Sequence, residues 1–189
     1  MINQHLTVIN QIKEIYAYFS SIKAFRNLVP EVRTNISGAL SNATNKNGIA
    51  AIEGRITVIG DYPKACGDIK FGVSDHTARL LLTARKFDAE IHFVMNLKYE
   101  SFFIEKIENQ NILSLREIQR EKQPDHLKKK EHSTMQWLIK ECYDEMGVIP
   151  DIIWDKGAMG KEPMIRLFSK NAEDMISKLE LLLECSNVI

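Results

Sequence analysis

Apolar side chains recur three and four positions apart through the first thirty residues, from Val8 to Ile22. This spacing lines one face of a helix and predicts an amphipathic helix that ends before Pro30. The same periodicity returns in later segments, which we predict to be helical: residues 76–87 with Asp75 at the N-cap, a short helix near 99–107, Met135–Met146 stopped by Gly147, and Asn171–Leu183 capped by Asn171.

Shorter apolar or alternating runs lie between these helices and predict strands. The run Ile91–Leu97 is almost continuously apolar, which is typical of a central strand buried on both faces. The other predicted strands are Arg33–Leu40, Arg55–Ile59, 112–117, Asp151–Trp154 and 164–169. We predict loops at 41–48, at the turn-rich connection 60–68, and at the charged, proline-containing segment 120–132, which we expect to be exposed.

Helices and strands alternate without a repeat or an evident linker, so we expect residues 1–189 to form a single α/β domain. The predicted architecture is a three-layer α/β/α sandwich with helices on both faces of a mixed sheet. Neither a Walker loop nor a Gly-x-Gly-x-x-Gly motif follows a predicted strand, which disfavours the nucleotide-binding folds defined by those motifs.

The composition is that of a soluble globular protein, with 44% hydrophobic and 26% charged residues among 189. The 25 basic and 25 acidic residues balance, which argues against nucleic acid as a partner. The sequence holds neither an apolar run of membrane-spanning length nor a secretory signal, so we expect no membrane association and a cytoplasmic protein. Three widely spaced cysteines indicate neither a disulfide framework nor a zinc site.

The first candidate site is the loop Asp155–Pro163, between two predicted strands. Gly157 and Gly160 would let backbone N–H groups approach an anion, and Lys156 and Lys161 would add positive charge. The alternative is an ordinary hairpin-like turn with solvated lysines.

The second candidate is the predicted helix start at Asp75, His76 and Arg79. A helix N-terminus suits phosphate, and His76 and Arg79 lie on the same helical face. A histidine here can donate a proton near neutral pH. The alternative is a capping Asp75 beside an exposed His76.

The third candidate is the pair Arg33 and Arg55, whose planar guanidinium groups match phosphate oxygens. Each arginine could equally pair with a surface carboxylate, which would contribute little. Asn96 is polar within an apolar strand and is a candidate orienting group. The histidines show no metal-binding spacing, so we predict no protein-bound metal.

In chain order, the segments VRTNISGAL, AIEGRI, FGVSDHTAR, MNLKYE and DIIWDKGAMGKEPMIR resemble the ThiN family, the archaeal-type thiamine-phosphate synthases. The resemblance covers nearly the whole chain, and Asp155–Arg166 is its most specific part. It implies a class II aldolase-like α/β/α fold. It also implies a transferase that joins hydroxymethylpyrimidine diphosphate to hydroxyethylthiazole phosphate, releasing pyrophosphate.

The family's arginine and histidine correspond to Arg55 and His76, which the resemblance makes the catalytic residues. The substrate-binding residues that we predict are Arg33, Asn35, Arg79, Asn96, Asp155, Lys156, Gly157, Gly160, Lys161 and Glu162. A diphosphate could bring Mg²⁺ held by substrate and water, for which we assign no protein ligands.

The expected partners are phosphorylated small molecules, together with a fused or associated hydroxymethylpyrimidine phosphate kinase and a second copy of the chain in a homo-oligomer. Two alternatives stay open. One is a non-catalytic domain that senses thiamine phosphate or its precursors in a regulator; the other is an aldolase-type metal enzyme, against which the missing histidine cluster speaks.

Overall fold

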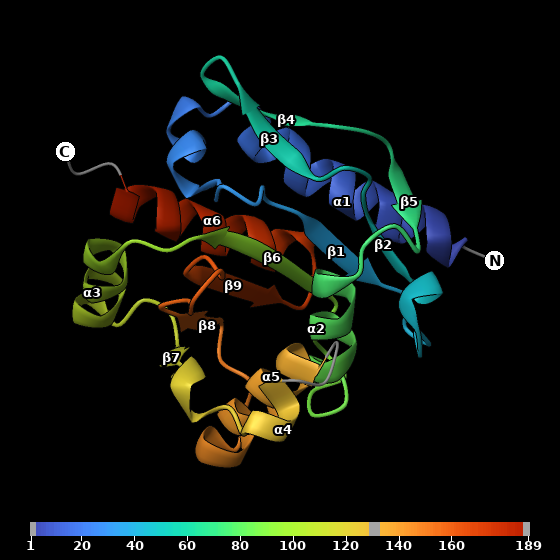
Figure 1. Ribbon diagram of the computed structural model, residues 1–189. Coiled ribbons are helices and arrows are strands. Elements are labelled where there is room, and N and C mark those ends of the chain that lie inside the picture. The colour runs from blue at the N-terminus through green and yellow to red at the C-terminus, as the bar shows by residue number, and fades with distance from the viewer. Residues whose placement is uncertain (1–2, 129–132, 187–189) are drawn as a thin grey trace.

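A seven-stranded mixed sheet forms the centre of the computed structural model, which describes residues 3–128 and 133–186 (Figure 1). Its strand order is β5-β2-β1-β6-β9-β8-β7, and every pairing is antiparallel except that of β7 with β8. The strands are β1 (Ile36–Ala39), β2 (Ile49–Ile52), β5 (Ile69–Phe71), β6 (Phe93–Lys98), β7 (Leu115–Glu117), β8 (Ile152–Asp155) and β9 (Met164–Ser169).

Helices cover both faces of this sheet (Figure 1). On one face lie α1 (Gln4–Ser20), the 3-10 helix Lys23–Leu28, α3 (Ser101–Gln110) and α6 (Ala172–Ser186). On the other face lie α2 (His76–Ala84) and α5 (Ser133–Met146), with the short α4 (Asp125–Lys128) against α5. Among the described residues, no helix is long and apolar enough to cross a membrane.

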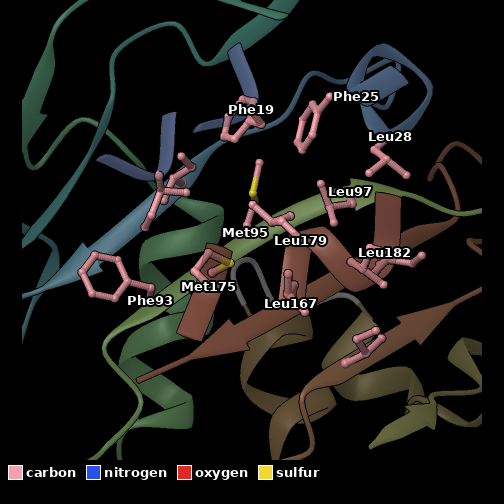
Figure 2. Packing of buried hydrophobic residues seen from close by; sticks show 14 of the residues in the cluster. Phe19, Phe25, Leu28, Phe93, Met95, Leu97, Leu167, Met175, Leu179 and Leu182 are labelled. Carbon is pink, nitrogen blue, oxygen red and sulfur yellow. The ribbon is translucent and has the colours of Figure 1, made fainter. Parts of the chain in front are cut away.

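Alternation along the strands sends side chains into two separate cores, one on each face. The larger core packs α1 and α6 onto β6 and β9. In Figure 2, Phe19 and Phe25 approach Met95 and Leu97 from above the sheet. Phe19 and Phe25 stack with their ring centroids 4.0 Å apart. The predicted central strand is confirmed, because β6 lies between β1 and β9 and is mostly buried.

The connection predicted at 60–68 is wrong in part, because it contains strand β4 (Tyr62–Ala65). Among the described strands it pairs with β3 (Ile56–Ile59) alone, and the two form a separate ribbon. Pro63 lacks a backbone N–H, a deficit that an edge strand tolerates. Strand β2 was also missed, since its short sequence IAAI carries no alternation.

The exposed loop predicted at 120–132 is wrong in part over its described residues, most of which are exposed as predicted. Residues Arg120–Lys122 form a 3-10 turn and α4 follows, whereas residues 129–132 lie outside the described part. Arg120 is only 8% exposed and Gln123 only 3%. The buried Arg120 forms an ion pair with Asp155, which is distant in the sequence.

Candidate active site

Polar side chains replace apolar ones at one end of the sheet, on the face that carries α2 and α5. Asn35, Asn96 and Arg166 lie in one row across neighbouring strands. In the strand register Asn96 of β6 is opposite Arg166 of β9. On its other side, Asn96 Oδ1 accepts a hydrogen bond from the backbone N–H of Asn35 (2.8 Å). Asp155 on β8 is fully buried beside this row. These side chains leave the apolar core and form the floor of a cavity.

The cavity has a volume of about 1050 Å³. It lies between this end of the sheet, the first turns of α2 and α5, and the loops that precede β1 and β3. Counting described residues only, six cationic side chains and three carboxylates line it, so the cavity is cationic although the chain is neutral.

Nine of the residues predicted to form the site line this one cavity. They are Arg33, Asn35, Arg55, His76, Arg79, Asn96, Gly160, Lys161 and Glu162. The three candidate regions therefore meet, although the functional roles assigned to these residues stay predictions.

Asp155, Lys156 and Gly157 do not line the cavity. Lys156 Nζ lies 3.3 Å from Glu117 Oε1 and over the ring of Trp154, and its side chain is exposed. For Lys156, the alternative of a solvated lysine in an ordinary turn therefore fits better than an anion-binding role. Gly157 shapes the loop: its φ is +76°, and a Cβ there would lie 2.3 Å from the carbonyl oxygen of Lys161. Asp155 lies behind the cavity wall, where it pairs with Arg120 and Arg166.

Arg33 and Arg55 hold each other's backbone in a reciprocal arrangement. The Arg33 guanidinium donates to the carbonyl of Gly54 (3.2 Å), and that of Arg55 donates to the carbonyl of Val32. The residues that follow them, Thr34 and Ile56, exchange two backbone hydrogen bonds.

Both arginines adopt a left-handed backbone, with φ of 70° and 71°. Side chains other than glycine rarely adopt this conformation, which costs about 1–2 kcal/mol. Strain of this kind persists only where the surroundings hold it, and it is concentrated at functional sites.

Polar side chains around Arg33 hold the strained segment in place. The Glu162 carboxylate accepts from the backbone N–H groups of Glu31 (2.9 Å) and Val32 (3.1 Å). The Asn96 amide donates to the carbonyl of Arg33 (2.9 Å), so Asn96 does orient its neighbour. Asn35 bonds both backbone groups of Ile52 and thereby joins β1 to β2.

Hydroxyl groups fix the start of α2 on the sheet. Thr77 Oγ1 lies 2.6 Å from Ser37 Oγ on β1 and 2.6 Å from Ser74 Oγ. Asp75 occupies the predicted N-cap position, and both of its carboxylate oxygens pair with Arg79 at 2.7 Å. His76 is the first residue of the helix, so it is exposed at the cavity beside the helix's positive end.

Sequence reasoning missed Arg120 and Arg166, which line the cavity from the side of β9 and β8. Both pair with Asp155, at 2.6 Å and 2.7 Å. Burial would raise the pKa of the Asp155 carboxyl, but the charges of Arg166 and Arg120 outweigh burial and hold the pKa below its usual value. Burial also lowers the pKa of Arg166, against the attraction of Asp155. Arg166 lies inside the DIIWDKGAMGKEPMIR segment, whereas nothing local marks Arg120.

The fold and this cavity together define a mixed α/β protein with a cationic cavity suited to anionic small molecules. A family model described as thiamine-phosphate synthase ThiN matches residues 11–181, and the chain belongs to this family.

Two curated relatives agree. The chain is 35% identical to the bifunctional thiamine biosynthesis protein ThiDN of Methanocaldococcus jannaschii, over 99% of this chain and 44% of that protein. It is 30% identical to the thiamine-phosphate synthase ThiN of Methanothermobacter thermautotrophicus, over 88% of this chain and 87% of that one. The chain thus spans less than half the length of the first relative and most of the second.

Solved structures support the same assignment. The C-terminal domain of a phosphomethylpyrimidine kinase superposes with a TM-score of 0.88 at 32% identity, over 94% of this chain and 99% of that one. An aldolase II superfamily protein from Pseudomonas syringae reaches a TM-score of 0.53 at 9% identity, over 99% of this chain and 76% of that one. The second likeness concerns the fold alone.

Proposed function

We propose that this chain acts as a thiamine-phosphate synthase domain, which joins hydroxymethylpyrimidine diphosphate to hydroxyethylthiazole phosphate and releases pyrophosphate. The observation that carries the proposal is the meeting of Arg55 and His76 in one cavity with Arg33 and Arg79. The family membership of the chain supports the same reaction.

The reaction breaks the bond between the pyrimidine methylene carbon and its diphosphate oxygen, and the thiazole nitrogen forms a new bond to that carbon. Negative charge develops on the leaving diphosphate while positive charge develops on the methylene carbon. Cations fixed near the diphosphate stabilise this separation most strongly at the transition state.

Arg55 would hold the diphosphate, and His76 would donate a hydrogen bond or a proton to it. The carbonyl bonds that Arg55 and Arg33 make to each other's segments fix both side chains before a ligand arrives. These bonds use only part of the five N–H donors that each guanidinium has. Arg79, held by Asp75, would add a further charge at the start of α2.

The size and lining of the cavity also fit two small substrates. Its volume of about 1050 Å³ lies just above the range for ligand pockets, about 300–1,000 Å³, which suits a site for two substrates. Leu80, Met135 and Met164 give it apolar surface for the two aromatic rings.

We further propose that any Mg²⁺ enters with the diphosphate and is held by substrate and water. Within the described residues, no group of three or more metal-binding side chains is found. Of the cavity carboxylates, Asp75 pairs with Arg79 and Glu162 binds backbone N–H groups. These carboxylates therefore do not form a preformed cage.

The setting of the activity is also a proposal. One relative is named bifunctional, and one solved structure is the C-terminal domain of a phosphomethylpyrimidine kinase. We therefore propose that this domain works in the cytoplasm, fused to or associated with such a kinase. We also propose that the fold is class II aldolase-like. The support for this is the superposition on the aldolase II superfamily protein, which has a TM-score of 0.53 at 9% identity.

Mixing both substrates with the protein tests the proposal. We expect pyrophosphate and thiamine phosphate to appear in equal amounts. Binding of the substrates without turnover would contradict the proposal and favour a ligand-sensing domain, an alternative to which the names of the relatives give no support.

A further inference from the structure

Two arginines line the cavity on the side of β8 and β9, and both pair with a buried aspartate behind them. Asp155 Oδ1 lies 2.6 Å from Arg120 Nε, and Asp155 Oδ2 lies 2.7 Å from a terminal nitrogen of Arg166. The side chains of Arg120, Arg166 and Asp155 are 7%, 4% and 0% exposed.

Among the residues that the structure describes, two guanidinium groups of this cluster face a single carboxylate, so its charges do not balance. Asp155 Oδ1 also accepts a hydrogen bond from the backbone N–H of Gly157 (2.8 Å), so this oxygen is shared between Arg120 and Gly157. A buried charge without a full counter-charge is strongly destabilising. Both arginines line the cavity, so an anion bound there would supply the missing negative charge.

The cluster lies apart from the reciprocal arrangement of Arg33 with Arg55, the arginine proposed to hold the diphosphate. Arg33 lies two residues before Asn35, whose backbone bonds Asn96 on one side of β6, whereas Arg166 lies on β9 on the other side of β6. Two strand spacings are about 10 Å. The backbones that carry Arg33 and Arg166 are therefore about two strand spacings apart, which leaves room for a second phosphate group beside the diphosphate.

We propose that Arg120 and Arg166 form a second anion subsite, which takes the phosphate monoester of the thiazole substrate. Asp155 is a positioning residue that orients both guanidinium groups. The identity of the ligand rests on the proposed function; the subsite itself rests on the buried excess charge. A planar guanidinium pair suits the phosphate because each group can donate two parallel hydrogen bonds.

The test replaces Arg120, because R120Q leaves the pair of Arg166 and Asp155 balanced and should fold. Calorimetry would measure binding of hydroxyethylthiazole phosphate and of the unphosphorylated hydroxyethylthiazole to each protein. We expect R120Q to weaken binding of the phosphate about 10- to 100-fold, the range for charge-assisted hydrogen bonds, with little change for the alcohol. R120K should recover part of the loss, and K156A, outside the cavity, should match the wild type.

If R120Q bound the phosphate and the alcohol more weakly by the same factor, or bound both as tightly as the wild type, the proposed subsite would be overturned. A higher KM for the pyrimidine diphosphate with an unchanged KM for the thiazole phosphate would also overturn it. Failure of the proposed function is distinguishable, because the wild-type protein would then release no pyrophosphate. Calorimetry on the thiazole phosphate would still decide whether the subsite exists.

Discussion

Arg55 shows how a single residue can combine local strain with a chemical role. Its left-handed φ of 71° suits glycine better, yet glycine has no guanidinium group to bind a diphosphate. Arg33 repeats this geometry on the other side of the reciprocal arrangement. At these two positions, the proposed chemistry explains why the chain keeps an unfavourable backbone.

This conflict predicts an ordering of two variants at position 55. R55A and R55G both lose the guanidinium, but only alanine keeps the left-handed strain, so R55G should be more stable by about 1 kcal/mol. Urea unfolding would measure the difference, and both variants should lose turnover. R55A matching or exceeding R55G in stability would contradict the strained backbone.

At the scale of elements, the two halves of the connection from β8 to β9 have different surroundings. The second half faces the cavity, whereas the first half packs inside the loop. Ala158 and Lys161 exchange backbone hydrogen bonds at the turn. From this turn, Gly160, Lys161 and Glu162 reach the cavity, while Gly157 packs tightly within the loop. The two glycines that form one sequence motif therefore have different structural roles.

Alanine substitutions at the two glycines should separate these roles. G157A and G160A share the cost of a positive φ, about 1–2 kcal/mol. A Cβ at Gly157 also meets backbone atoms at 2.3 Å and 2.9 Å, whereas none lie within 4 Å of one at Gly160. We expect G157A to lower the thermal midpoint clearly more than G160A, and equal effects would contradict the loop geometry.

At the scale of the whole molecule, Asp151 links three elements far from the cavity. Its carboxylate accepts from the backbone and hydroxyl of Ser114, next to β7, and pairs with Lys178 of α6 at 2.7 Å. Burial raises the pKa of the Asp151 carboxyl, but Lys178 and Ser114 outweigh burial and hold the pKa below its usual value.

A lowered folded-state pKa means that Asp151 stabilises the fold above its unfolded pKa, near 3.9, and loses this effect as the pH falls through the folded value. D151N should therefore cost about 1–2 kcal/mol at pH 7 and progressively less below about pH 4. D144N, at an exposed pair with Lys140, should cost at most about 0.5 kcal/mol. Unfolding curves across pH would check this, and a cost that stays constant down to pH 2 would contradict it.

The sequence predicted those elements whose periodicity is local, including α1, β6 and α6. It also indicated the cavity residues that lie in segments of the family pattern, such as Arg33 and His76. It could not reveal that Lys156 lies outside the cavity, since only the tertiary fold decides which side of the loop faces inward.

The sequence alone could not identify Arg120 as a residue of the cavity. This arginine lies in a charged, proline-containing segment, which is ordinarily solvent-exposed. It is buried beside Asp155, which lies 35 residues away in the chain but 2.6 Å away in the folded protein. The second proposed subsite is therefore a property of the folded molecule.

The most direct test of the account is the turnover of R55A, H76A and the double variant, measured as pyrophosphate release, with K156A as the control. We expect each single variant to lose about 10²–10³ in rate. The double variant should lose less than the product of the two, because both groups act on the same leaving diphosphate. Near-normal turnover in either single variant would contradict the central claim.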